Sequence, residues 1–175
     1  MNAPRSGEFR VELLSAEHNR QGFTCGIPAL DTYLQRQARQ ERDRGTVVPY
    51  VLVPVDNPTE IAGFYTLSST RVPLQDMPPD VVKKLPRYPT IPATLLGRLA
   101  VSEAHQGKRL GEYLLVDALS RSLEASQRIA SVAVIVDAKD DRGAAFYERY
   151  GFRRFPDQRL RLFIAMKTIA MLQSQ

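Results

Sequence analysis

The chain has 175 residues and a formal net charge of +5 at pH 7, so its length fits one domain and its basic charge favours acidic partners. Cys25 is the only cysteine, which excludes an intramolecular disulfide and favours the reducing cytosol. Because the sequence shows no signal-peptide pattern and no apolar run of membrane-spanning length, we expect one soluble cytoplasmic domain over residues 1–175, with no membrane contact.

The first part of the chain predicts three strands and one helix. Residues 9–14 alternate weakly between apolar and polar types, which indicates a first strand. Pro28 suits the first turn of a helix, and apolar residues then recur at helical spacing to about Arg42. Residues 47–55 and 61–70 are rich in β-branched and aromatic side chains, and the DNPTE sequence between them predicts an antiparallel hairpin.

A proline-rich segment follows. Half of the twelve prolines lie between Pro73 and Pro92, so this segment cannot form a long regular helix or a central strand. We expect a short helix over about residues 79–85, flanked by extended loop.

The remaining sequence predicts a strand-helix-strand unit over residues 94–101, 108–126 and 132–136. The two strands should be parallel and their connection right-handed. Asp140 or Asp141 then suits the cap of a helix through Tyr150, which Gly151 ends. Further strands are expected at residues 152–155 and 160–167.

The sequence LLGRLAVSEAHQGKRLG, from Leu95 to Gly111, joins the strand of this unit to its helix. Backbone N–H groups at a helix N-terminus have no intrahelical partner, and the helix dipole adds partial positive charge there. The turn is therefore suited to a pyrophosphate, which Gly107 and Gly111 would allow to approach the main chain. A glycine-bearing turn of this kind is by itself a weak signal, because many strand-helix turns contain glycine.

This strand, QGKRLG and the helix beginning GEYLLVDAL resemble the acetyl-CoA-binding core of the GNAT N-acetyltransferases, whose pattern is Q/R-x-x-G-x-G/A. Gln106 and Gly111 match its first and last positions, whereas Arg109 replaces the central glycine. A second block, VDAKDDRGAAFYERYGF from Val136 to Phe152, resembles the tyrosine-bearing helix of the same core. The resemblance implies a single-domain α/β (α+β) GNAT fold: a mixed sheet of about six to seven strands with a splayed parallel pair, flanked by about four helices.

The resemblance also implies acetyl-CoA as cosubstrate and Tyr147 as the catalytic residue, whose hydroxyl gives a proton to the departing CoA thiolate. From the residues alone, Tyr147 could equally pack in the core with Phe146 and Tyr150, and Tyr150 is a second candidate for the acid. Lys108 and Arg109 fit solvated cations as well as phosphate ligands, and Asp137 also fits a helix cap. The residues implied to contact acetyl-CoA are Leu99, Ala100, Val101, Gln106, Gly107, Lys108, Arg109, Leu110, Gly111 and Asp137.

Further similarity covers nearly the whole chain. FTCGIPALDTYL, GFYTLSS and LPRYPTIPATLLGRLAV resemble a subgroup that includes acetyltransferase toxins of bacterial toxin–antitoxin pairs, which acetylate the amino group of aminoacyl-tRNA. The resemblance implies tRNA as acceptor and a ribbon-helix-helix antitoxin as partner, and it leaves a homodimer open. The same cations would also suit a solvated helix face and a soluble proline-rich loop. The candidate tRNA contacts are Arg36, Arg39, Lys83, Lys84, Arg87 and Arg98.

Other chemistry has little support in the sequence. His18 and His105 are the only histidines, and no CxxC or HExxH spacing is present, so we predict no metal site. No signature of a Ser-His-Asp or Cys-His nucleophile is present either. Two alternatives stay open beside the tRNA acceptor: an N-acetyltransferase acting on a protein or small-molecule amine, and a catalytically weak module that binds acetyl-CoA or RNA.

Overall fold

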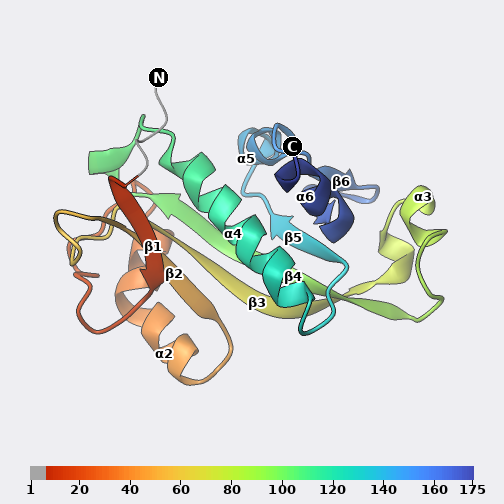
Figure 1. Ribbon diagram of the computed structural model, residues 1–175, viewed down its shortest axis with the longest axis horizontal. Helices are drawn as coiled ribbons and strands as arrows, with labels where there is room; N and C mark the ends of the chain where they lie inside the picture. Colours follow the sequence, from red (N-terminus) through yellow and green to blue (C-terminus); the bar gives the residue numbers. More distant parts are fainter. Residues whose placement is uncertain (1–6) are drawn as a thin grey trace. The chain divides into compact units, whose positions relative to one another are not determined.

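The computed structural model describes residues 7–175, and its seven strands form one mixed sheet in the order β1-β2-β3-β4-β5-β7-β6 (Figure 1). This sheet confirms the expected fold class. The strands are β1 (Phe9–Leu13), β2 (Val48–Pro54), β3 (Gly63–Pro73), β4 (Thr90–Val101), β5 (Ala133–Asp137), β6 (Arg153–Phe155) and β7 (Gln158–Ala165).

The chain divides into two compact units. The first comprises Met1–Ser68 and Gly97–Ala118, and the second comprises Ser69–Leu96 and Leu119–Gln175. The strands β3 and β4 and the helix α4 (Leu110–Ser126) have residues in both units. The expectation of one domain over residues 1–175 stays a prediction.

In the first unit, β1 pairs antiparallel with β2, and β2 pairs antiparallel with β3 as the predicted hairpin. The inward side chains of these strands build a core around Phe64, Val51 and Leu34. The helix expected from Pro28 to Arg42 is interrupted. It consists of α1 (Pro28–Thr32), a π-helical turn over Tyr33–Gln37 and α2 (Ala38–Asp43).

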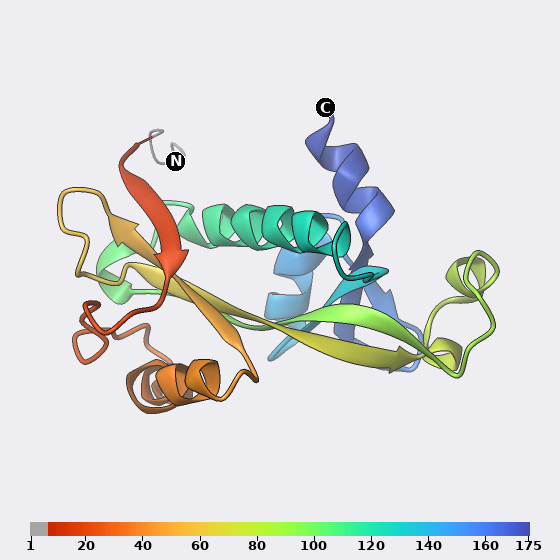
Figure 2. The same ribbon diagram turned by 60° about the horizontal axis from the view of Figure 1, so that its bottom comes forward.

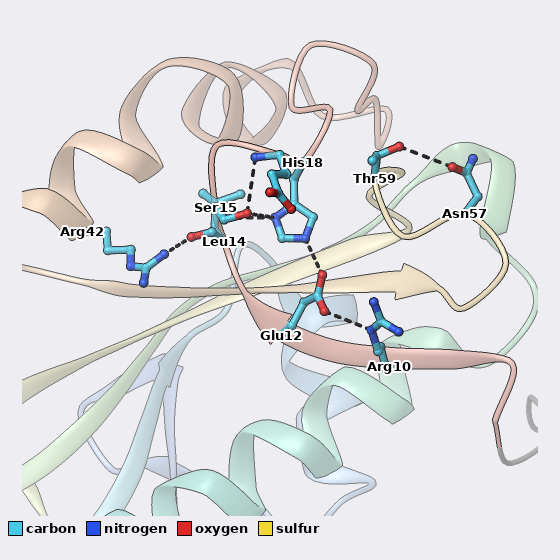
Figure 3. A network of polar contacts seen from close by, with 9 residues as sticks. Arg10, Glu12, Leu14, Ser15, His18, Arg42, Asn57 and Thr59 are labelled. Carbon is cyan, nitrogen blue, oxygen red and sulfur yellow. Dashed lines mark hydrogen bonds and ion pairs between the residues drawn. The ribbon is translucent and has the colours of Figure 1, made fainter.

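Figure 3 shows how the loop after β1 is fastened in this unit. The Ser15 N–H donates to Nδ1 of His18 at 3.0 Å, so the ring proton lies on Nε2 and is donated to Glu12 at 2.7 Å. Burial raises the pKa of Glu12, but the hydrogen bonds from His18 and Arg10 outweigh burial and lower it overall. Arg42, on α2, donates to the Leu14 carbonyl. The network fixes the entry into the loop that leads to α1.

In the second unit, the predicted parallel pair forms between β4 and β5, with Thr94–Leu96 in register with Val134–Val136. β4 begins earlier than predicted because Pro92, which lacks an N–H, still offers a carbonyl that accepts from Val132 at 2.9 Å. A short helix, α3 (Pro79–Val82), lies in the proline-rich segment as expected, after a 3₁₀ turn at Leu74–Asp76.

The C-terminal half of this unit follows the prediction except at its end. Asp140 caps α5 (Asp141–Glu148) by accepting from the Gly143 N–H at 2.8 Å, and Gly151 follows with a φ of +97°. The strand predicted over residues 160–167 stops at Ala165, where α6 (Met166–Gln173) begins. This helix was not predicted. Met166 and Ile169 are its buried residues, and their spacing of three suits one helix face.

Candidate functional site

The turn between β4 and α4 presents main-chain donors. It contains a 3₁₀ turn at Glu103–His105 and then Gln106–Arg109. Helical bonding in α4 starts with the Tyr113 N–H, which donates to the Arg109 carbonyl at 3.2 Å. The N–H groups of Leu110, Gly111 and Glu112 therefore have no carbonyl to bond within the helix. These N–H groups and the dipole of this long helix are features that suit a phosphate, and the predicted contact with a pyrophosphate stays a prediction.

Gln106 holds this turn in place. Its side-chain amide donates to the carbonyls of Val101 and Cys25, both at 3.2 Å. Because the amide is engaged within the protein, a ligand here would meet the main chain of the turn rather than this side chain. Cys25 itself is buried, and burial raises the pKa of its thiol to about 11.

Arg109 occupies the position of the central glycine in the GNAT pattern. Its φ is +60°, and it is the only non-glycine residue with a positive φ among residues 7–175. Left-handed backbone costs an ordinary residue about 1–2 kcal/mol. The turn thus keeps the backbone shape that glycine normally supplies, although the residue is arginine. Its guanidinium donates to Glu112 at 2.8 Å.

The other cation of the turn is also partnered. The Lys108 ammonium lies 3.4 Å from Nδ1 of His105, and Nε2 of His105 lies 2.9 Å from a carboxylate oxygen of Glu60. Since an ammonium can only donate, His105 accepts at Nδ1 and donates from Nε2. Sequence reasoning missed Glu60. It lies 45 residues before His105, and no local pattern links a hairpin turn to this loop.

The end of β4 leads into the turn. Ala100 is buried, Leu99 and Val101 are half-buried, and the Ser102 N–H donates to the Ala62 carbonyl at 2.8 Å. Arg98 was predicted to contact tRNA. Its guanidinium lies 3.6 Å from the centre of the Tyr33 ring, so this cation packs within the first unit.

Tyr147 lies on α5 in the second unit. Its ring packs against Phe146 and Phe152, with centroid distances of 5.2 and 5.3 Å. Burial raises the pKa of its phenol to about 12, so the phenol stays protonated at neutral pH. Within residues 7–175 we find no hydrogen-bond partner for this hydroxyl, whereas the hydroxyls of Tyr33 and Tyr65 each donate to a carboxylate at 2.5 Å. Tyr147 thus combines core packing with an uncommitted proton donor.

Asp137 ends β5 and does not cap α5, because Asp140 has that role. Across the register with β7, its carboxylate lies 3.0 Å from Nε of Arg161. That nitrogen is buried and makes no well-aligned hydrogen bond, so the contact is ionic. The sequence-based alternative of a helix cap at Asp137 is therefore wrong.

The remaining candidate cations lie at the surface of their units. Lys83, Lys84 and Arg87 are exposed, as is Arg36, while Arg39 is half-buried. Among the described residues, no acidic side chain within ion-pair distance is found for Arg36, Arg39, Lys83 or Arg87. Within the same range, no cluster of side chains could hold a metal ion. No helix formed by residues 7–175 has the length and apolar character needed to cross a membrane.

Comparison with known proteins gives consistent matches. A family model described as "Acetyltransferase (GNAT) domain" matches residues 80–154. The tRNA-acetylating toxin of Mycobacterium tuberculosis is 35% identical over 145 residues, which cover 83% of this chain and 84% of the toxin. A protein of Sinorhizobium fredii named "Probable toxin TacT" is 28% identical over 89% of both chains.

Solved structures agree over a larger share of the chain. A mutant of KacT with one tyrosine replaced by phenylalanine has a TM-score of 0.87 at 29% identity, covering 94% of this chain and 99% of its own. AtaT complexed with acetyl-methionyl-tRNAfMet has the same TM-score at 27% identity, with the same coverage. A tyrosine-to-phenylalanine mutant of AtaT, bound to the C-terminus of the antitoxin AtaR and to acetyl-CoA, has a TM-score of 0.79 at 26% identity, covering 96% of this chain and 99% of its own.

Proposed function

We infer the function of this chain from the premise that it belongs to the GNAT acetyltransferase family. It is an acyltransferase that moves an acetyl group from acetyl-CoA to an amine. We propose that the amine is the amino group of aminoacyl-tRNA and that the result is arrest of translation. The observation that carries this proposal is the 35% identity, over 83% of the chain, to a toxin named for tRNA acetylation.

Residues of the β4–α4 turn fit the donor. The outward N–H groups of Leu110, Gly111 and Glu112 suit the pyrophosphate, and Lys108 and Arg109 add charge beside them. We propose that the backbone of Leu99, Ala100 and Val101 receives the pantetheine arm as an added strand would. Acetyl-CoA supplies the acetyl group as a thioester, which an amine can attack.

We propose Tyr147 as the general acid. As the C–N bond forms and the C–S bond breaks, the phenol gives its proton to the departing sulfur and the amine loses a proton to solvent, and the phenolate then regains a proton from solvent. A phenol with a pKa of about 12 and no partner for its hydroxyl among residues 7–175 is protonated and available for this step. The two similar structures solved with one tyrosine replaced by phenylalanine also support a special role for a tyrosine in these proteins.

The cations Arg36, Arg39, Lys83, Lys84 and Arg87 are proposed to bind tRNA phosphates. Arg98 is a poorer candidate, because its guanidinium is engaged with Tyr33. We also propose an antitoxin of ribbon-helix-helix type as partner, supported by the AtaT structure that contains the C-terminus of its antitoxin. Action on tRNA implies a cytoplasmic location, and a homodimer is compatible with these proposals.

The direct test offers labelled acetyl-CoA to the protein with a mixture of charged tRNAs, uncharged tRNAs, peptides and polyamines in separate reactions. We expect label only on charged tRNA, in a form that base releases as an N-acetyl amino acid. Label confined to peptides or polyamines would exclude the tRNA acceptor and favour the alternative amine acceptors. Calorimetric binding of acetyl-CoA without turnover on any amine would instead indicate a binding module.

A further inference from the structure

The segment between β3 and β4 forms a pocket of about 790 Å³ in the second unit. Figure 2 shows this segment extending beyond the ends of the two strands. None of the described residues that line the pocket is acidic. Its apolar lining comes from Leu74, Val82 and Leu85, and its polar lining includes Lys83, Arg87 and Tyr88.

Backbone hydrogen bonds and apolar packing fix the shape of the pocket. The Leu74 N–H donates to the Pro89 carbonyl at 3.0 Å, which closes the base of the segment, and the Tyr88 N–H donates to the Pro86 carbonyl at 2.9 Å. Leu74, Val82 and Leu85 pack against the core of the second unit. Pro86 and Pro89, on either side of Tyr88, restrict the backbone. The segment would therefore lose little conformational entropy when a ligand binds.

The chemistry of the pocket is unusual for a solvated loop. Tyr88 is 65% exposed, and within residues 7–175 its hydroxyl makes no side-chain hydrogen bond and its ring contacts no other aromatic ring. Asp80, the acidic residue of α3, is held by Arg153 at 2.9 and 3.0 Å, so it does not neutralise Lys83 or Arg87. The pocket therefore offers a flat aromatic surface beside two cations that lack ion pairs among the described residues.

We propose that this pocket binds an unpaired nucleotide of an RNA, with the base stacked on Tyr88 and the phosphates against Lys83 and Arg87. A flat exposed ring next to an apolar floor suits a base, and unneutralised cations suit the flanking phosphates. An acidic peptide would use the cations but would need an added aromatic side chain to stack on the ring, whereas every nucleotide carries both a phosphate and a planar base. The inference rests on the proposed function in taking RNA as the acceptor, and it places a single-stranded part of that RNA at the proline-rich segment.

The test measures binding of a fluorescently labelled single-stranded RNA hexamer of mixed sequence at several salt concentrations, without acetyl-CoA. We expect Tyr88→Leu to weaken binding about tenfold and Tyr88→Phe to stay within about twofold, because phenylalanine keeps the stacking surface. The double variant Lys83→Gln with Arg87→Gln should reduce the slope of log affinity against log salt by about 1.4. Arg128→Gln, at an exposed arginine with 82% side-chain exposure that does not line the pocket, is the control and should change neither quantity.

Equal affinity of wild type and Tyr88→Leu for the hexamer would overturn the proposal. Tyr88-dependent binding of an acidic peptide that displaces the RNA would also overturn it, in favour of a protein partner. Thermal unfolding of each variant checks that the fold is intact, which is expected because Tyr88 is exposed. The binding assay needs neither an aminoacyl group nor turnover. Its failure is therefore distinguishable from failure of tRNA acetylation, which the labelling experiment reports.

Discussion

At the scale of single residues, Tyr147 differs from Tyr33 and Tyr65 in the hydrogen bonding of its hydroxyl. The hydroxyls of Tyr33 and Tyr65 donate hydrogen bonds to carboxylates, whereas the hydroxyl of Tyr147 has no such acceptor within residues 7–175. We expect Tyr147→Phe to lower kcat by about 10²- to 10⁴-fold, the usual contribution of a general acid, while acetyl-CoA affinity stays within about twofold. Steady-state kinetics and calorimetry measure the two effects.

Tyr150→Phe is the matched control, because Tyr150 lies one turn after Tyr147 beside the same Phe146 ring. Its kcat should stay within about threefold of wild type. Unchanged turnover in Tyr147→Phe would remove Tyr147 from its role, and a large loss in Tyr150→Phe would transfer that role. Since the pKa of Tyr147 is about 12, its ionisation should cause no fall in kcat below about pH 11.

Arg109 stores strain that glycine would relieve. A left-handed backbone costs arginine about 1–2 kcal/mol, which glycine would avoid. Glycine has more freedom in the unfolded chain, and this would offset about 0.5–1 kcal/mol of the gain. The partly exposed ion pair to Glu112 adds about 0.3–0.5 kcal/mol. We therefore expect Arg109→Gly to keep or raise the free energy of unfolding, by up to about 1 kcal/mol.

Urea unfolding of Arg109→Gly measures this effect. Arg142→Gly makes the same exchange inside the α5 helix and should lose about 1 kcal/mol. A comparable loss in Arg109→Gly would show that the arginine side chain contributes more than its backbone costs.

Cys25 gives a pH-dependent prediction. Burial raises its pKa from 9.0 to about 11, so at pH 8 the native thiolate fraction is about 100-fold below that of an ordinary thiol. A thiol-reactive dye should modify the native chain at least about 100-fold more slowly than the urea-unfolded chain. Because the folded pKa is raised, the stability linked to this thiol is complete below pH 9 and is lost as pH rises through about 11. Equal rates for the two forms would show that the thiol is accessible.

At the scale of elements, the contact between β3 and β4 depends on Gly63. A Cβ placed there would lie 2.9 Å from the Ala100 carbonyl oxygen and 2.8 Å from a Leu114 methyl group. We expect Gly63→Ala to lower the free energy of unfolding by about 1–3 kcal/mol, because a backbone oxygen cannot move without distorting the strand. Thermal unfolding measures the loss.

Gly143→Ala is its control. A Cβ at Gly143, in the first turn of α5, would meet only ordinary contacts at 3.5 and 3.7 Å. Better helix propensity should then raise stability by about 0.5–1 kcal/mol. Loss of stability in both variants would point to a general cost of the added methyl group rather than to a clash with the Ala100 carbonyl oxygen.

Most elements could be predicted because local chemistry decides them. Asp140, Gly151 and the apolar strand β5 each carry their own signal, and the structure places all three as expected. The π-helical turn at Tyr33–Gln37 and the helix α6 depend on tertiary packing, which short-range spacing does not encode. Apolar residues run without a break from Leu162 to Met166, so the sequence does not mark the point at which β7 ends and α6 begins.

At the scale of the whole molecule, some features of the candidate site could be predicted from the sequence and others could not. The GNAT resemblance predicted the phosphate-binding turn and Tyr147 as candidates, because both lie in contiguous motifs. It could not predict that Arg109 adopts glycine-like backbone or that Glu60 bonds His105, since both depend on the folded loop. The pocket at Tyr88 was equally hidden, because an exposed tyrosine between prolines has no sequence signature.

The cations proposed to bind tRNA phosphates predict how the affinity for tRNA depends on salt concentration. If Arg36, Arg39, Lys83, Lys84 and Arg87 each neutralise one phosphate, log affinity for tRNA should fall with log salt at a slope of about −4.5. Raising salt from about 50 to 200 mM would then lower kcat/KM for aminoacyl-tRNA about 500-fold. An amino acid methyl ester, used as acceptor with the same acetyl-CoA, controls for salt effects on donor binding and should lose far less.

The variant with all five cations replaced by glutamine should show a nearly flat salt dependence with tRNA while keeping its rate with the methyl ester. This outcome would assign the basic charge to the acceptor. Equal salt sensitivity of the two acceptors in wild type would instead assign it to donor phosphates, because acetyl-CoA is common to both reactions. A steep slope that survives in the variant would mean that cations other than these five contact the tRNA.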